Sequence, residues 1–295
     1  MTSTVIAAVI AVILGFLIGC SLTFVFGRLP ESWLQDYDYD PKADNYRPSK
    51  RMKMVPHGVL AGIFCAAFYL AAAIFFPELL TGRWIIHMIA IVLTVPVLFL
   101  VLISDKLNRI IPDQFPILIL IFGFLLLASD YLEGTIWFTE NAPWYAPIIN
   151  RVGAAILGGG VLFLIGFIGE MVTSREAMGQ GDMKLLIGCG MVTGLYGLIV
   201  LIYVAVIVGV FFAIPLLIRK QKRLREEQEY IDSSDDPIKA QIELKLKKKN
   251  MHYADDPDYL AFGPFLAIGA GVFIAMEPVF FKLMLNYMTV FNLYF

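Results

Sequence analysis

Apolar residues form seven long runs along the chain, and shorter polar segments separate them. A helix needs roughly 20 apolar residues to cross the hydrocarbon layer of a membrane. Inside that layer the backbone must satisfy its own hydrogen bonds, which favours helices. The pattern therefore predicts an all-α, polytopic membrane protein with apolar runs at 4–26, 58–77, 84–104, 115–128, 148–168, 183–218 and 260–277.

The run 183–218 is too long for one crossing. Basic residues, Lys184 and Arg219, stand at both of its ends, so we expect both ends on the same side of the membrane and two crossings. The turn is expected near 194–197, which gives about eight transmembrane helices in total. The first arm, 183–193, would be only about 16 Å long. We therefore expect a thinner bilayer there, or water that enters from one side.

Composition agrees with a membrane protein and excludes several classes. Apolar residues make up 59% and charged residues 16% of the 295 positions, against about 45–50% and about 25% in soluble proteins. A soluble enzyme, a nucleic-acid-binding domain and a disordered regulator are excluded. The net charge of −2 gives no reason to expect a polyanionic partner. The three cysteines lie far apart and form no CxxC pair, so we expect no metal site and no disulfide framework.

Basic residues concentrate in two polar loops. Of the 23 Lys and Arg, 16 lie in 27–57 and 219–258. Loops that are rich in Lys and Arg stay on the cytoplasmic side, so both loops are predicted to be cytoplasmic. The segment 129–147 contains neither residue and is expected on the outside.

The second polar loop shows two patterns. Residues 219–230 extend the preceding span as a helix. Apolar and polar residues then alternate over 238–246, which fits either a strand or a helix on the surface. The lysines at 247–249 are candidates for contact with anionic lipid.

Two carboxylates lie where the membrane makes them costly. Asp105 ends one apolar run, and Asp182 stands at the head of the short arm. An ionisable residue at membrane depth suggests a functional site. Two carboxylates that meet in a low-dielectric site do not both ionise easily, so one can act as an acid while the other acts as a base. This is the chemistry of an aspartic peptidase.

The neighbours of Asp182 extend the hypothesis. Gly179 and Gly181 leave the backbone bare, and we expect an extended segment that could pair with a peptide substrate or take a positive φ. Lys184 would either favour the ionised form of Asp182 or anchor the helix end at the membrane surface. The glycine triplet 158–160 is expected to serve close helix packing.

Four ordered blocks along the chain resemble the bacterial type IV prepilin peptidases, which are membrane aspartic peptidases of the GxGD type. Gly15-x3-Gly19 with Arg28-Leu-Pro30 is similar to the family's amino-terminal block. The other three blocks read Asp105-KLNRII-Pro112-Asp113, Met178-Gly179-Gln-Gly181-Asp182-Met-Lys184-Leu and Phe262-GPFLAI-Gly269. The resemblance implies that Asp105 and Asp182 are catalytic, and that Gly179, Gly181, Lys184 and Pro112 support them. Asp113 is expected to cap the next helix.

The resemblance also implies an organisation and a substrate. Residues 1–57 would form an amino-terminal span and a short cytoplasmic loop, and 58–295 a membrane peptidase domain with an insertion at 219–258. The enzyme would work in the bacterial plasma membrane and cut the basic leader of type IV prepilins or pseudopilins at the cytoplasmic interface. Many members carry two CxxC pairs in the first loop, but the first loop of this chain contains no cysteine. We therefore expect no metal, and S-adenosylmethionine only if the product is methylated. The residues that bind substrate cannot be assigned.

Two other classes fit the same composition. An ion-coupled transporter could use Asp105 and Asp182 as a relay, and it would be expected to show internal repeats, which we do not find. A non-enzymatic assembly protein of a pilus or secretion machine could bind its partners through 219–258 and would tolerate loss of both aspartates.

Overall fold

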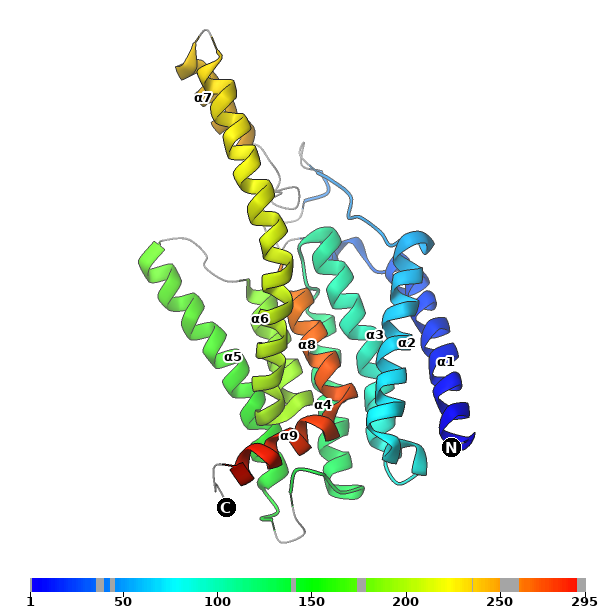
Figure 1. Cartoon of the computed structure of the whole chain (residues 1–295). Coiled ribbons are helices and arrows are strands. Elements are labelled where there is room, and N and C mark those ends of the chain that lie inside the picture. The colour runs from blue at the N-terminus through cyan, green and yellow to red at the C-terminus, as the bar shows by residue number, and fades with distance from the viewer. Residues whose placement is uncertain are drawn as a thin grey trace.

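The structure is a computed structural model that describes residues 2–35, 40–42, 46–138, 142–173, 179–234, 236–249 and 260–290. Over these residues it is all-helical, as predicted (Figure 1). The long helices are α1 (Thr2–Gly27), α2 (Val59–Phe75), α3 (Ile85–Asn108), α4 (Gln114–Leu132), α5 (Ala146–Thr173), α6 (Gln180–Asp232), α7 (Pro237–Lys249), α8 (Gly263–Ala275) and α9 (Glu277–Val290). Short helical turns occupy Glu31–Trp33, Met54–Gly58 and Pro77–Thr81.

Six helices among the described residues are long and apolar enough to cross a membrane. The pair α8–α9 is bent by 81° and makes a seventh if it counts as one span. Helix α6 has 53 residues but is broken at Gly194. The sequence predicted about eight crossings, and the described residues provide six or seven such helices because the two arms of α6 count as one. The chain is therefore a multi-pass membrane protein.

The break in α6 is a reversal of the chain. We call 180–193 the short arm and 195–232 the long arm. Asp182, at the start of the short arm, lies beside Gly263 at the start of α8, whereas Gly197 in the long arm lies beside Phe273 near the end of α8. The short arm thus runs along α8 in one direction and the long arm runs back in the other.

Gly194 makes this reversal possible. Its φ of +72° and ψ of 178° fall in a region that is essentially restricted to glycine. A Cβ atom there would lie 2.5 Å from Nδ2 of Asn150. The side chain of Asn150 accepts a hydrogen bond from the N–H of Leu195 at 2.9 Å. Helix α5 therefore satisfies a backbone group that the broken helix leaves open.

Helix α3 is buried along most of its length and lies against α4 and α8. Helix α1 is at the edge of the bundle (Figure 1), where Gly15 and Gly19 bring its backbone against Ala66 and Ala61 of α2. The outer faces of α1 and α5 carry many exposed apolar side chains. A bilayer would cover these faces.

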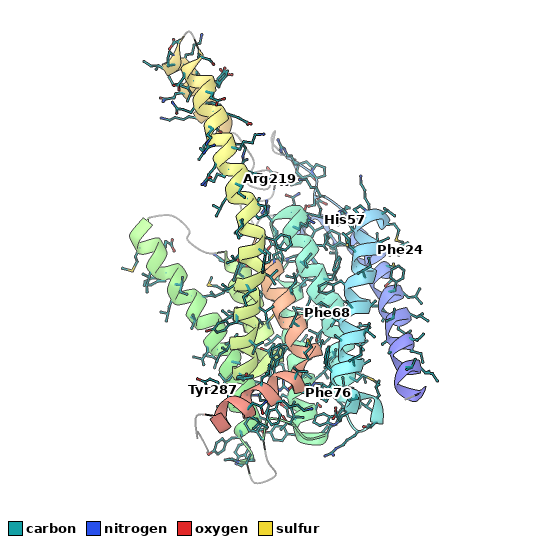
Figure 2. All side chains as sticks on the ribbon, viewed as in Figure 1. Phe24, His57, Phe68, Phe76, Arg219 and Tyr287 are labelled. Atoms are coloured by element: carbon teal, nitrogen blue, oxygen red, sulfur yellow. The ribbon has the colours of Figure 1, made fainter. Side chains whose placement is uncertain are left out.

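The two polar loops lie at one end of the bundle. Figure 2 shows His57 and Arg219 at that end, and Phe76 and Tyr287 at the opposite end. The predicted helical continuation is confirmed, because α6 runs on to Asp232. The strand alternative for 238–246 is wrong, because these residues belong to α7. The described part of the tail forms α9, which bends away from α8.

Buried ionic contacts hold the opposite end together. The guanidinium of Arg151 in α5 pairs with the carboxylate of Asp130 in α4, and it donates to the carbonyl of Val192 at 2.7 Å. At the bend between α8 and α9, the Glu277 carboxylate lies 3.1 Å from Nε2 of His87 and accepts the indole N–H of Trp137. The turn of α6 and the bend of α9 are therefore fixed to α3, α4 and α5.

Candidate active site

Asp105 lies in the last turn of α3 and is only 4% exposed. The helix ends at Arg109, whose φ is +60° and whose N–H donates to the carbonyl of Asp105 at 2.9 Å. Ser104 reinforces this turn, because its hydroxyl donates to the carbonyl of Ile110 at 2.8 Å. The chain leaves the helix immediately after Asp105, and the segment that follows folds back over the carboxylate.

Asp182 lies in the first turn of α6. Its backbone N–H donates to the carbonyl of Gly179 at 3.1 Å. The expected extended segment around Asp182 is wrong, because only Gly179 is extended (φ −67°, ψ 128°) and Gly181 is already helical. Neither glycine has a positive φ. The amino end of a helix favours negative charge, so the position of Asp182 suits a carboxylate.

The two aspartates converge on Gly263, the first residue of α8. A Cβ atom on Gly263 would lie 2.7 Å from Oδ2 of Asp105 and 3.2 Å from Oδ1 of Asp182. The two oxygens are therefore at most about 6 Å apart, the sum of those distances, which is close enough for their charges to interact. The backbone N–H of Gly263 donates a hydrogen bond to the Asp105 carboxylate. Any residue larger than glycine would push into the space between the carboxylates.

The segment between α3 and α4 covers this pair. Ile111 lies against the first turns of α6 and α8. A Cβ atom on Gly181 would lie 3.2 Å from the Cβ of Ile111, and a Cβ atom on Gly263 would lie 2.6 Å from the Cδ1 of Ile111. The carbonyl of Pro112 accepts the N–H of Phe115 at 3.0 Å and so begins α4. Pro112 therefore shapes the turn that leads into α4.

Lys184 forms an ion pair that the sequence did not predict. Its Nζ lies 2.8 and 2.9 Å from the two carboxylate oxygens of Asp113. Asp113 stands at the N-cap position of α4 but makes no side-chain capping hydrogen bond, so the expected capping role is wrong. The ion pair joins the short arm, two positions after Asp182, to the start of α4.

The first polar loop is attached to the same end of α3. Asn108 accepts the N–H of Lys50 at 2.8 Å and donates to the carbonyl of Lys50 at 3.2 Å. Next to this contact, Arg51 pairs with Glu31 at 2.5 Å and donates to the carbonyl of Leu29 at 2.8 Å. The loop thus anchors the turn that carries Asp105.

Glu31 is the centre of that anchor. Burial alone would raise the pKa of Glu31, but hydrogen bonds from the backbone N–H and hydroxyl of Ser49, from Gln35 and from Arg51 lower it to about 2. The carboxylate is therefore charged at neutral pH and binds both ends of the loop together.

Among the described residues no group of three or more His, Cys, Asp or Glu side chains could hold a metal ion. Cys20, Cys65 and Cys189 are free. The chemistry available at the site is that of two carboxylates beside one backbone N–H donor. Such a pair can remove a proton from water and deliver one to a leaving group.

Reasoning from sequence missed two contributors to the site. The first is Gly263, whose N–H donates to Asp105 and whose lack of a side chain leaves space between the two carboxylates. The FGPF block that contains Gly263 was part of the resemblance, but no role was assigned to this glycine. Asp113 is the partner of Lys184 across 71 positions. The opposite charges of Asp113 and Lys184 were visible in the sequence, but no local pattern pairs residues that are so far apart along the chain.

Residues 91–214 match the family described as the type IV leader peptidase family. A 76-residue segment is 32% identical to a prepilin leader peptidase/N-methyltransferase from Neisseria gonorrhoeae. That segment covers 26% of this chain and 27% of the relative, so the likeness spans about a quarter of each protein. No solved structure matches the chain. The family match includes both Asp105 and Asp182.

Proposed function

We propose that this chain, whose residues 91–214 match the type IV leader peptidase family, is an aspartic peptidase that removes the leader of type IV prepilin-like proteins. The observation that carries the proposal is the convergence of Asp105 and Asp182 on Gly263. Asp105 is buried and Asp182 is half-buried, and placing two carboxylates together away from water is costly without a function.

In the proposed reaction the two aspartates share one proton. The ionised carboxylate takes a proton from water while the oxygen of that water attacks the scissile carbonyl carbon. The protonated carboxyl gives its proton to the amide nitrogen, and the C–N bond breaks. Because coupled carboxylates titrate as a unit, the roles of acid and base belong to the pair. The water molecule is consumed and the pair again holds one proton, so the step balances.

The proposed location of the reaction is the cytoplasmic surface of a bacterial plasma membrane. Asp105 lies at the end of the bundle that carries both Lys- and Arg-rich loops, and such loops stay in the cytoplasm. A substrate with a basic leader and an apolar helix would place its scissile bond at this depth. Cleavage needs no cofactor in this proposal, and S-adenosylmethionine would be required only to methylate the product.

The proposal is tested by incubating membranes that contain the full chain with a prepilin-type substrate and measuring the mass of the product. We expect a product shortened by its leader. An intact substrate would contradict the peptidase and would favour a transporter or an assembly protein. Release of the leader by membranes that lack the chain would show that another enzyme is responsible.

A further inference from the structure

A cavity of about 620 Å³ lies between α5 and the short arm of α6. It begins beside the proposed catalytic pair, because Gln180 and Met183, two and one positions from Asp182, contribute to its wall. Its other wall is the carboxyl-terminal half of α5, which leans away from the rest of the bundle in Figure 1. The cavity therefore lies between the arm of α6 that carries Asp182 and the lipid-facing helix α5.

The floor of the cavity includes a glycine that packs against nothing. Gly158 and Gly159 serve helix packing as predicted, since Cβ atoms there would lie 3.1 Å from Leu186 and 2.4 Å from Ile187. Gly160 differs, because a Cβ atom there would have no neighbour within 4 Å. Glycine inside a helix is less favourable than alanine. At Gly160 no packing contact with the described residues accounts for the glycine, but the absence of a side chain leaves room for a second helix to approach the backbone closely.

The walls are apolar for most of the cavity and charged at one end. Phe163 and Phe167 line it, are 58% and 52% exposed, and stack with ring centres 6.2 Å apart. Glu170 and Lys184 stand at the end nearest the polar loops. The ammonium group of Lys184 is bound by Asp113, so Glu170 brings a carboxylate to this end of the cavity.

We propose that this cavity binds the apolar transmembrane helix of the substrate. The helix backbone lies against Gly160, its side chains contact Phe163 and Phe167, and the basic residues of its leader approach Glu170. In this position the chain leaves the cavity beside Met183 and reaches Asp182. The assignment rests on the proposed peptidase function. An anionic lipid is a poorer occupant, because its headgroup would meet the Glu170 carboxylate, whereas a basic leader is attracted by it.

The proposed role of the cavity is tested by replacing Gly160 with larger residues that occupy it. Gly160→Ala, Gly160→Leu and Gly160→Trp are compared in the full chain in membranes. We expect KM for the substrate to rise with the size of the side chain at position 160, least with alanine, by about tenfold with leucine and by about a hundredfold with tryptophan, with smaller changes in kcat. The matched control is Gly27→Trp, because Gly27 also has no neighbour within 4 Å of a Cβ atom but lies at the end of α1.

A photo-crosslinking amino acid then identifies the occupant directly. It is placed at Phe167 in the cavity or at Phe211, an exposed aromatic on the long arm that is 71% exposed, each in the Asp182→Asn background. We expect adducts to the apolar helix of the substrate from position 167 and none from 211. Adducts to lipid alone, or equal adducts from both positions, would overturn the assignment.

The two proposals fail separately. If the wild type does not cleave the substrate, the peptidase function is wrong. If the wild type cleaves but Gly160→Trp has an unchanged KM and position 167 gives no substrate adduct, only the cavity is wrong.

Discussion

At the scale of single residues, the proposed site depends on the glycine at position 263. Gly263 begins α8, gives its N–H to Asp105 and leaves open the space between the two carboxylates. Three helix ends meet there: the carboxyl end of α3 and the amino ends of α6 and α8. The amino ends favour negative charge nearby, which helps to explain how two acidic residues are accommodated in a buried place.

We expect Gly263→Ala to abolish most cleavage without unfolding the protein. The new methyl group would lie 2.7 Å from Oδ2 of Asp105, so the carboxylates must separate, and a displacement near 1 Å can cost about a hundredfold in rate. The rate of leader release in membranes measures the effect. Gly27→Ala adds the same methyl group at the end of α1, where no described atom lies within 4 Å of a Cβ atom, and serves as the control. Equal activity of the two variants would contradict the role of Gly263.

Lys184 and Asp113 should act as one unit. Their side chains are each 39% exposed, so the pair contributes little to stability, and its importance lies in positioning the short arm. Asp113→Asn and Lys184→Met are each expected to lower kcat by about threefold to tenfold, and the double variant is expected to be no less active than the less active single variant. A double-mutant cycle on kcat measures this coupling. Multiplicative losses would show that the two residues act independently.

At the scale of elements, the reversal in α6 sets the distance between the site and the far end of the bundle. Gly194→Ala would place a side chain at φ +72° and against Asn150. Strain of this kind costs about 1–3 kcal/mol, so the thermal unfolding temperature in detergent should fall. Asn150→Ala, which removes the acceptor of the Leu195 N–H, should lower the unfolding temperature as well. An unchanged unfolding temperature in Gly194→Ala would contradict the claim that the reversal requires glycine at this position.

The first polar loop should loosen only in strong acid. The pKa of Glu31 is lowered from 4.5 to about 2. A group with a lowered pKa stabilises the folded state above its ordinary pKa, and that stabilisation is lost as pH falls through the folded value. Hydrogen exchange of the Ser49 amide, which donates to Glu31, should therefore be slow above about pH 5 and accelerate toward about pH 2 beyond its intrinsic pH dependence. Glu31→Gln should exchange rapidly throughout, and a wild-type loop with the same protection at both extremes would contradict the anchor.

Much of the element order was predictable because apolar runs and basic residues report directly on membrane crossing. The turn of α6 was predictable from Lys184, Arg219 and the glycine at 194. The alternation in 238–246 was not decisive, because a solvated helix can show the same residues, and the structure forms α7 there. The extended segment at Gly181 was wrong, because the helix begins at Gln180. Contacts such as Lys184 with Asp113 depend on the packing of α6 against α4 and are not visible in a local pattern.

At the scale of the whole molecule, the two ends of the bundle differ. One end carries the polar loops, the two aspartates and the charged end of the cavity. The other is fixed by buried contacts, among them those of Arg151 and Glu277. This polarity suits an enzyme that receives a membrane helix from the bilayer and cuts it at one surface. The long arm of α6 continues from the first end as far as Asp232.

The central claim is that Asp105 and Asp182 together cut the leader. The most direct measurement compares the wild type, Asp105→Asn, Asp182→Asn and the exposed control Asp232→Asn in membranes, with the mass of a prepilin-type substrate as the readout. We predict leader release by the wild type and by Asp232→Asn. Asp105→Asn and Asp182→Asn should each give none, with unfolding temperatures close to that of the wild type. Wild-type rates in either Asp105→Asn or Asp182→Asn would contradict the two-aspartate site.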